Sequence, residues 1–114
     1  MPCRYIWGKQ KMRELNFFVK GQKLEKDKRC NFDGIVKGTS GYLRCSFSFS
    51  REWTGKSVAA QFWCLGNEYA SPVINGICDI PDDALVWNNF QLNLVGQDKN
   101  QRIVTNKVTI KQEG

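Results

Sequence analysis

The sequence of 114 residues contains no histidine, and this absence removes several classes of enzyme from consideration. Nucleophilic sites of the Ser-His-Asp and Cys-His types require an imidazole as the base. A zinc site built from cysteine and histidine is excluded for the same reason, and the five cysteines include no C-x-x-C pair. We therefore expect neither a metal nor another cofactor.

Other common signals are also missing. No apolar run approaches the roughly 18 residues that a transmembrane helix needs, so no membrane partner is expected. The opening MPCRYIWGKQKM lacks the apolar segment of a signal peptide. The segment GTSG at 38–41 has no Walker lysine and indicates a turn. We interpret the five cysteines as reduced thiols of a cytosolic protein that mostly fill its core.

Acid–base chemistry could still use carboxylates, and CDIPDDAL at 78–85 supplies Asp79, Asp82 and Asp83. A structural explanation accounts for the same residues. Pro81 suits the first turn of a short helix, and acids are favoured near a helix N-terminus by its dipole. We favour this explanation and predict that the protein is not an enzyme.

The positive charge is concentrated at one end of the chain. Of the net charge of +6, all of the excess falls within the first 29 residues, and the rest of the chain is neutral. The predicted basic patch consists of Lys20, Lys23, Lys26, Lys28 and Arg29. Such a patch could meet phosphate or an acidic protein. Ordinary solvated lysines on a strand pair explain it equally, because acids are interleaved with the bases.

Apolar and polar residues alternate with a period of two along most of the chain, which is typical of strands. The segment 42–49, YLRCSFSF, and the segment 90–96, FQLNLVG, both alternate in this way. The segment 57–65, SVAAQFWCL, is apolar on both faces, as expected for a central strand. One or two further short strands are predicted within 101–112.

Turn residues separate these segments. Asn75-Gly76 is the strongest two-residue hairpin signal, and 96–101, GQDKNQ, indicates a polar hairpin loop. The segment 14–28 predicts a strand, a turn near Gly21 and a second polar strand. The pattern predicts one small antiparallel β-sandwich of about seven or eight short strands over residues 12–114, with a helical turn at 81–86. Residues 1–11 are predicted to be an extension: an alternative start, a cloning remnant or a flexible arm.

Three quoted segments carry a family resemblance. FSFSREWTGKSVAAQF at 47–62 resembles the F-x-F-[SD]-x-E-W-x-G strand–turn–strand signature of small phage tail and baseplate domains. NGICDIPDDAL at 75–85 and FQLNLVGQDKNQRIVTNKVTI at 90–110 are similar to their later motifs, in the same order. The resemblance covers roughly residues 15–111. It implies an all-β sandwich like the N-terminal domain of baseplate upper and minor structural proteins, without catalytic residues.

The resemblance is compatible with two roles. Family members continue into a fibre, coiled-coil or receptor-binding part, whereas this sequence ends at IKQEG. The first role is a virion-associated accessory protein that docks on other phage proteins or on itself. The second is a free-standing inhibitor of a host or anti-phage defence complex, docking through its basic N-terminal region on protein or on nucleic acid. Either role implies a location in the host cytoplasm during infection, with incorporation in the virion for the first.

Aromatic residues divide into core and interface candidates. The core signature of the fold is predicted to be Phe47, Phe49, Trp53, Phe62 and Pro81. Trp63 shares a face with Gln61, which indicates either the covered side of a sandwiched strand or an exposed patch. The protein-interaction candidates are Trp63, Tyr69 and Trp87, with Arg44 and Arg51 at the rim. Solvated surface is the simpler explanation for both arginines.

Overall fold

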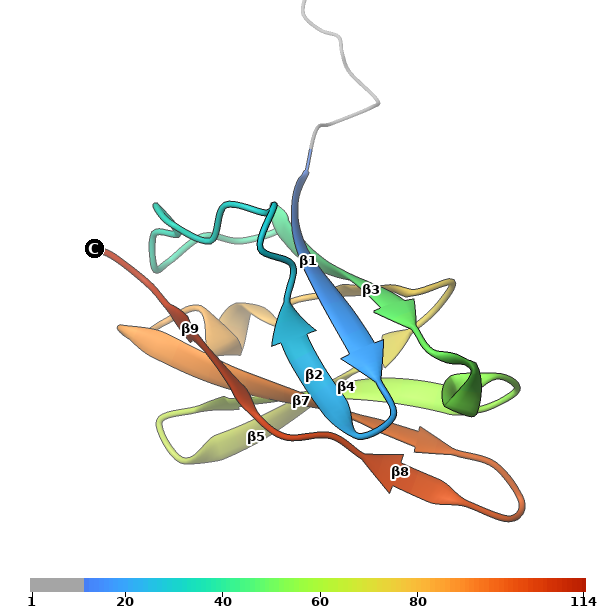
Figure 1. Cartoon of the computed structure of the whole chain (residues 1–114). Helices are drawn as coiled ribbons and strands as arrows, with labels where there is room; N and C mark the ends of the chain where they lie inside the picture. Colours follow the sequence, from blue (N-terminus) through green and yellow to red (C-terminus); the bar gives the residue numbers. More distant parts are fainter. Residues whose placement is uncertain (1–11) are drawn as a thin grey trace, which may run out of the picture.

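The computed structural model describes residues 12–114, so the predicted extension 1–11 lies outside the described residues. Nine strands and two short turns of 3-10 helix make up this part of the chain (Figure 1). The strands are β1 (Arg13–Lys20), β2 (Lys23–Lys26), β3 (Leu43–Phe49), β4 (Ser57–Cys64), β5 (Asn67–Val73), β6 (Ile77–Asp79), β7 (Asn89–Gln97), β8 (Arg102–Val104) and β9 (Val108–Lys111). The helical turns are η1 (Arg51–Trp53) and η2 (Asp82–Ala84). Within the described part, no helix is long and apolar enough to cross a membrane.

The strands form two sheets that enclose the core. Sheet A has the order β2-β1-β3-β6, and sheet C has the order β5-β4-β7-β8, with β9 also paired to β7 (Figure 1). The predicted all-β fold is confirmed, with nine strands in the described residues instead of seven or eight. The predicted helical turn is shorter than 81–86, because η2 spans only Asp82–Ala84.

One pairing differs from the all-antiparallel expectation. β1 and β3 run parallel, in register from Arg13 opposite Leu43 to Val19 opposite Phe49. Parallel neighbours need a crossover connection, and here β2 and the segment 27–42 carry the chain back to the start of β1. Local alternation shows which residues face the core, but it does not show the direction of the neighbouring strand.

The alternating apolar residues meet between the two sheets. Sheet A contributes Leu15, Phe17, Val19, Cys45 and Phe47, and sheet C contributes Ala60, Phe62, Phe90, Leu92 and Leu94, all buried. Trp53 is buried at one end of this core. Its indole Nε1–H donates to the carbonyl of Gly21 at 2.8 Å. The η1 turn that carries Trp53 therefore ties the β1–β2 turn to the sandwich.

The predicted turn at Asn75-Gly76 joins the two sheets. Both residues have positive φ, 54° and 78°, and Ile74 and Ile77 exchange backbone hydrogen bonds of 2.9 and 3.0 Å across the turn. This two-residue geometry favours Asn-Gly, because both central positions lie in the left-handed region. The turn links β5 of sheet C to β6 of sheet A, so it forms a corner of the sandwich.

Asn106 lies between β8 and β9 of sheet C, and its side chain is hydrogen-bonded to the edge strand β2 of sheet A. Its Oδ1 accepts from the backbone N–H of Leu24 at 2.8 Å, and its Nδ2 donates to the carbonyl of Leu24 at 3.1 Å. The preceding Thr105 accepts from the backbone N–H of Leu94 in β7 at 2.9 Å. The Asn106 side chain thus satisfies both backbone groups of Leu24 on the free edge of β2, and the neighbouring Thr105 is hydrogen-bonded to sheet C.

Candidate anion-binding surface

The β1–β2 hairpin and the turn that follows it form a shallow hollow of about 470 Å³, which we call the basic hollow. Its cationic lining residues are the five predicted for the basic patch, Lys20, Lys23, Lys26, Lys28 and Arg29. Phe18, Glu25 and Asp27 complete the lining. Lys26 differs from the other four cations, because it stands opposite the buried Phe17 and its ammonium lies over the Phe32 ring, on the inward side of β2. The other four cations against two carboxylates leave an excess of two positive charges around the outward concave surface.

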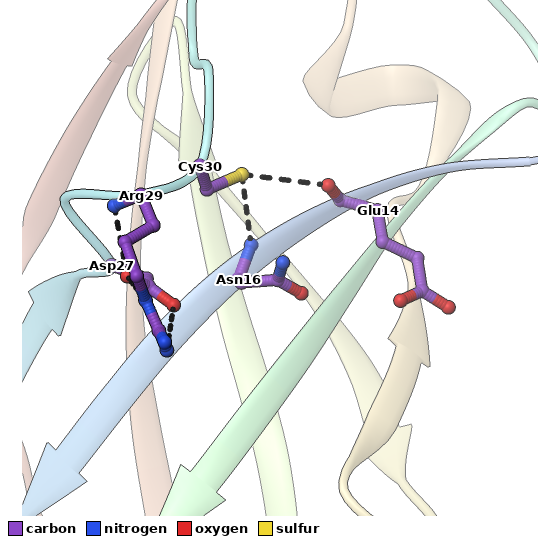
Figure 2. Close-up of polar contacts among 5 residues, drawn as sticks. All are labelled: Glu14, Asn16, Asp27, Arg29 and Cys30. Carbon is purple, nitrogen blue, oxygen red and sulfur yellow. Dashed lines mark hydrogen bonds and ion pairs between the residues drawn. The ribbon is translucent and has the colours of Figure 1, made fainter.

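The turn at residues 27–30 is fixed to the edge of β1 beyond the end of β2 (Figure 2). The backbone N–H of Asp27 donates to the carbonyl of Asn16 at 3.0 Å. The thiol of Cys30 accepts from the N–H of Asn16 at 3.5 Å and donates to the carbonyl of Glu14 at 3.6 Å. These bonds satisfy backbone groups that a longer β2 would have paired, and they hold the cationic turn in place.

Asp27 and Arg29 form a two-point ion pair within this turn (Figure 2). The guanidinium donates through Nε at 3.2 Å and through Nη2 at 3.1 Å to the two carboxylate oxygens. The Asp27 side chain is only 11% exposed, whereas that of Arg29 is 83% exposed. The Arg29 side-chain hydrogen bond lowers the pKa of Asp27, and the same bond raises the pKa of Arg29. Arg29 is therefore held at one end and open to solvent over most of its surface.

Phe18 lies on the outward face of sheet A beside this pair. It is half-buried and stands opposite Glu25 of β2 and Ser48 of β3. The guanidinium carbon of Arg29 lies 6.0 Å from the centre of its ring, within the range of a cation–π contact. Phe18 was not among the residues predicted for the patch. Alternation in RELNFFVK could have revealed it, since adjacent Phe17 and Phe18 must point to opposite faces.

The lysines of the basic hollow differ in how far they are neutralised. Lys20 and Lys23 share Glu25, at 4.0 and 3.5 Å. The Lys26 ammonium lies 5.3 Å from the centre of the Phe32 ring. Among residues 12–114, no carboxylate lies within 4.0 Å of Lys26 or Lys28. Of the cations on the outward side of the hollow, Lys28 is thus the one that no carboxylate of the described residues neutralises.

Trp63 lies on the outward face of sheet C, within a network of polar side chains. Its Nε1–H donates to Asn93 at 2.7 Å, and Asn93 donates to Gln61 at 2.9 Å. Gln61 in turn donates to Glu68 at 2.7 Å. The ammonium of Lys107 lies 4.0 Å from the centre of the Trp63 ring. Trp63 is half-buried, and its polar group is already satisfied within the sheet.

The other interaction candidates are distributed over different surfaces. Tyr69 stands opposite Phe62 and packs against the core, on the inward side of sheet C. Trp87 is 45% exposed after η2, with the Lys37 ammonium 5.7 Å from its ring centre. Arg44 lies on the outward face of sheet A and pairs with Glu14, and Arg51 is exposed in η1. The structure therefore does not join these residues to Trp63 in one patch.

The predicted core signature lies mainly inside the sandwich. Phe47, Trp53 and Phe62 are buried, and the partly buried Phe49 lies with its ring centre 5.4 Å from that of Trp53. Pro81 directly precedes η2, and its carbonyl accepts from the N–H of Ala84 at 3.0 Å.

Of the carboxylates singled out in CDIPDDAL, Asp79 and Asp82 line one shallow hollow, and Asp83 follows Asp82 in η2. Asp79 is exposed at the end of β6, and Asp82 lies in η2, where it accepts from the hydroxyl of Ser40 at 2.9 Å. Within the described part of the chain, no group of three or more histidine, cysteine or acidic side chains is arranged to hold a metal ion.

No protein-family model, curated protein or solved structure matches the chain. The resemblance to phage tail and baseplate domains therefore stays a prediction from the quoted motifs.

Proposed function

We propose that the protein is a non-enzymatic docking module that binds a negatively charged macromolecule through the basic hollow. The observation that carries this proposal is the excess of two positive charges on the outward side of one hollow, with Lys28 lacking a carboxylate within 4.0 Å among the described residues. Clustered cations raise the local concentration of an anionic partner and speed its encounter. This is the basic-region docking expected of the second role above.

A salt titration and a charge reversal test the proposal together. We expect the protein to be retained on immobilised heparin, used as a generic polyanion, and to elute as the salt concentration rises. The double variant Lys20→Glu/Lys28→Glu should elute at much lower salt. The matched control Lys99→Glu/Lys111→Glu changes the charge equally with exposed lysines outside the hollow. Equal losses in the two variants would show that only net charge matters and would refute the proposal.

Protein–protein docking in a phage particle remains the second candidate function, and the outward face of sheet C favours it. Trp63 is half-buried there, and Ala59 and Val95 are partly exposed on the same face. Tryptophan and small apolar groups are typical of the centre of an interface. Size-exclusion chromatography of the wild type and of Trp63→Ser tests it for self-association. A monomer at all concentrations, with no co-purifying phage protein, would exclude it.

A further inference from the structure

The outward face of sheet A carries several cations and the aromatic ring of Phe18. The described residues next to Phe18 on this face, along β1 and opposite it on β2 and β3, are all polar. Beside Phe18 on this face stand Asn16 and Lys20 along β1, Glu25 on β2 and Ser48 on β3. An aromatic residue that belonged to the core would be surrounded by apolar side chains. Among residues 12–114, Phe18 is instead the one apolar residue in the lining of the basic hollow.

Arg29 is arranged as a second planar surface above this ring. Its guanidinium lies 6.0 Å from the centre of the Phe18 ring, and Asp27 holds it by two parallel hydrogen bonds. The carboxylate fixes the orientation of the plane, while 83% of the side chain stays exposed. Planar guanidinium groups and aromatic rings are the two side-chain surfaces on which unstacked bases lie.

Given the polyanion binding proposed above, on which this inference rests, we infer that the partner is a single-stranded nucleic acid. One base stacks on the Phe18–Arg29 pair, and the phosphates on either side meet Lys20 and Lys28. A duplex is less suitable because its bases are stacked on one another and cannot lie against the sheet. An acidic protein would use the lysines alone and would gain nothing from the aromatic ring.

The experiment separates stacking from charge. Binding of fluorescein-labelled DNA and RNA 12-mers of mixed sequence is measured by fluorescence anisotropy, together with a DNA duplex of the same length and with polyglutamate. We expect a single strand to bind more tightly than the duplex, and the DNA and RNA arms to show which sugar is preferred. Because stacking of one base contributes about 1–3 kcal/mol, Phe18→Leu should weaken single-strand binding at least about 5-fold.

A second variant and a control protect this test against misfolding. Arg29→Lys keeps the charge but removes the planar group, and it should weaken single-strand binding without changing retention on heparin. Ser48→Ala alters the same face without removing charge or stacking, and it should bind as the wild type. Thermal unfolding of each variant confirms that it folds.

The possible results distinguish failure of the single-strand inference from failure of the docking function. If Phe18→Leu and Arg29→Lys both bind single strands as the wild type does, or if the duplex or polyglutamate binds best, the inference is wrong. The docking function still stands in that case, provided that the Lys20→Glu/Lys28→Glu variant loses heparin retention. If the wild type binds none of the four probes and is not retained on heparin, both the inference and the docking function fail.

Discussion

The indole of Trp53 lies directly against the backbone of Gly96, in the space that any larger residue would need. A β-carbon placed on Gly96 would stand 2.5 Å from Cζ3 of Trp53 and 2.6 Å from its Cε3. The ring is 4% exposed and donates a hydrogen bond to the carbonyl of Gly21, so moving it aside would disrupt both its packing and this bond. Gly96 is therefore required in β7 by this close contact.

Gly96→Ala should lower the free energy of unfolding by about 1–3 kcal/mol, because overpacking displaces a fixed ring. The sign of the change in the free energy of unfolding is informative. Without this contact, replacing glycine by alanine would stabilise the protein slightly, because it lowers the conformational entropy of the unfolded chain. Urea unfolding of Gly96→Ala, Trp53→Leu and the double variant measures the coupling. Once Trp53 is replaced, Gly96→Ala should cost little, and full additivity would contradict the close contact.

Asn106→Ala should lower the free energy of unfolding by about 1–3 kcal/mol, because it leaves the N–H and C=O of Leu24 without their partner. Hydrogen exchange provides the local measurement. The amide of Leu24 should exchange faster in the variant, while amides in β7 keep their protection. Asn100→Ala, in the exposed β7–β8 loop, is the control and should leave both quantities unchanged. Unchanged exchange at Leu24 in Asn106→Ala would refute the role of this side chain.

Asp98 should make the protein sensitive to acid. The backbone N–H of Asn100, the Lys56 ammonium at 3.0 Å and the backbone N–H of Gln101 lower its pKa from 3.8 to about 2. Since the pKa is lower in the folded state, the carboxylate contributes stability that is fully present above about pH 4. This contribution is lost as the pH falls from about 4 to about 2.

The variant Asp98→Asn tests this statement directly. It should be less stable than the wild type at pH 7, and the difference should shrink as the pH falls towards 2. Urea unfolding of both proteins at several pH values gives the two curves. A difference that stayed constant between pH 7 and pH 2 would show that the Asp98 charge contributes nothing to stability.

The sequence was sufficient to predict the strands and several turns, because burial of one face imposes alternation and because Asn-Gly suits a two-residue turn. It was insufficient for the parallel pairing of β1 with β3, since pairing depends on the path of the connection between them. The five cations of the basic hollow were also predicted from sequence. The outward position of Phe18 could have been predicted from the alternation in the sequence. The Phe18–Arg29 contact and the Asp27–Arg29 pair could not, because they arise only when the turn after β2 folds back onto β1.

The bond between Asn106 and Leu24 also limits the ways in which a partner can attach. An extended peptide could add itself to β2 only by taking the backbone groups that the amide side chain already occupies. Contacts at the neighbouring hollow then rely on its charged side chains, whose interactions are individually weak and screened by salt. Such a surface would release its partner readily, and its occupancy in a cell would follow ionic conditions and partner abundance.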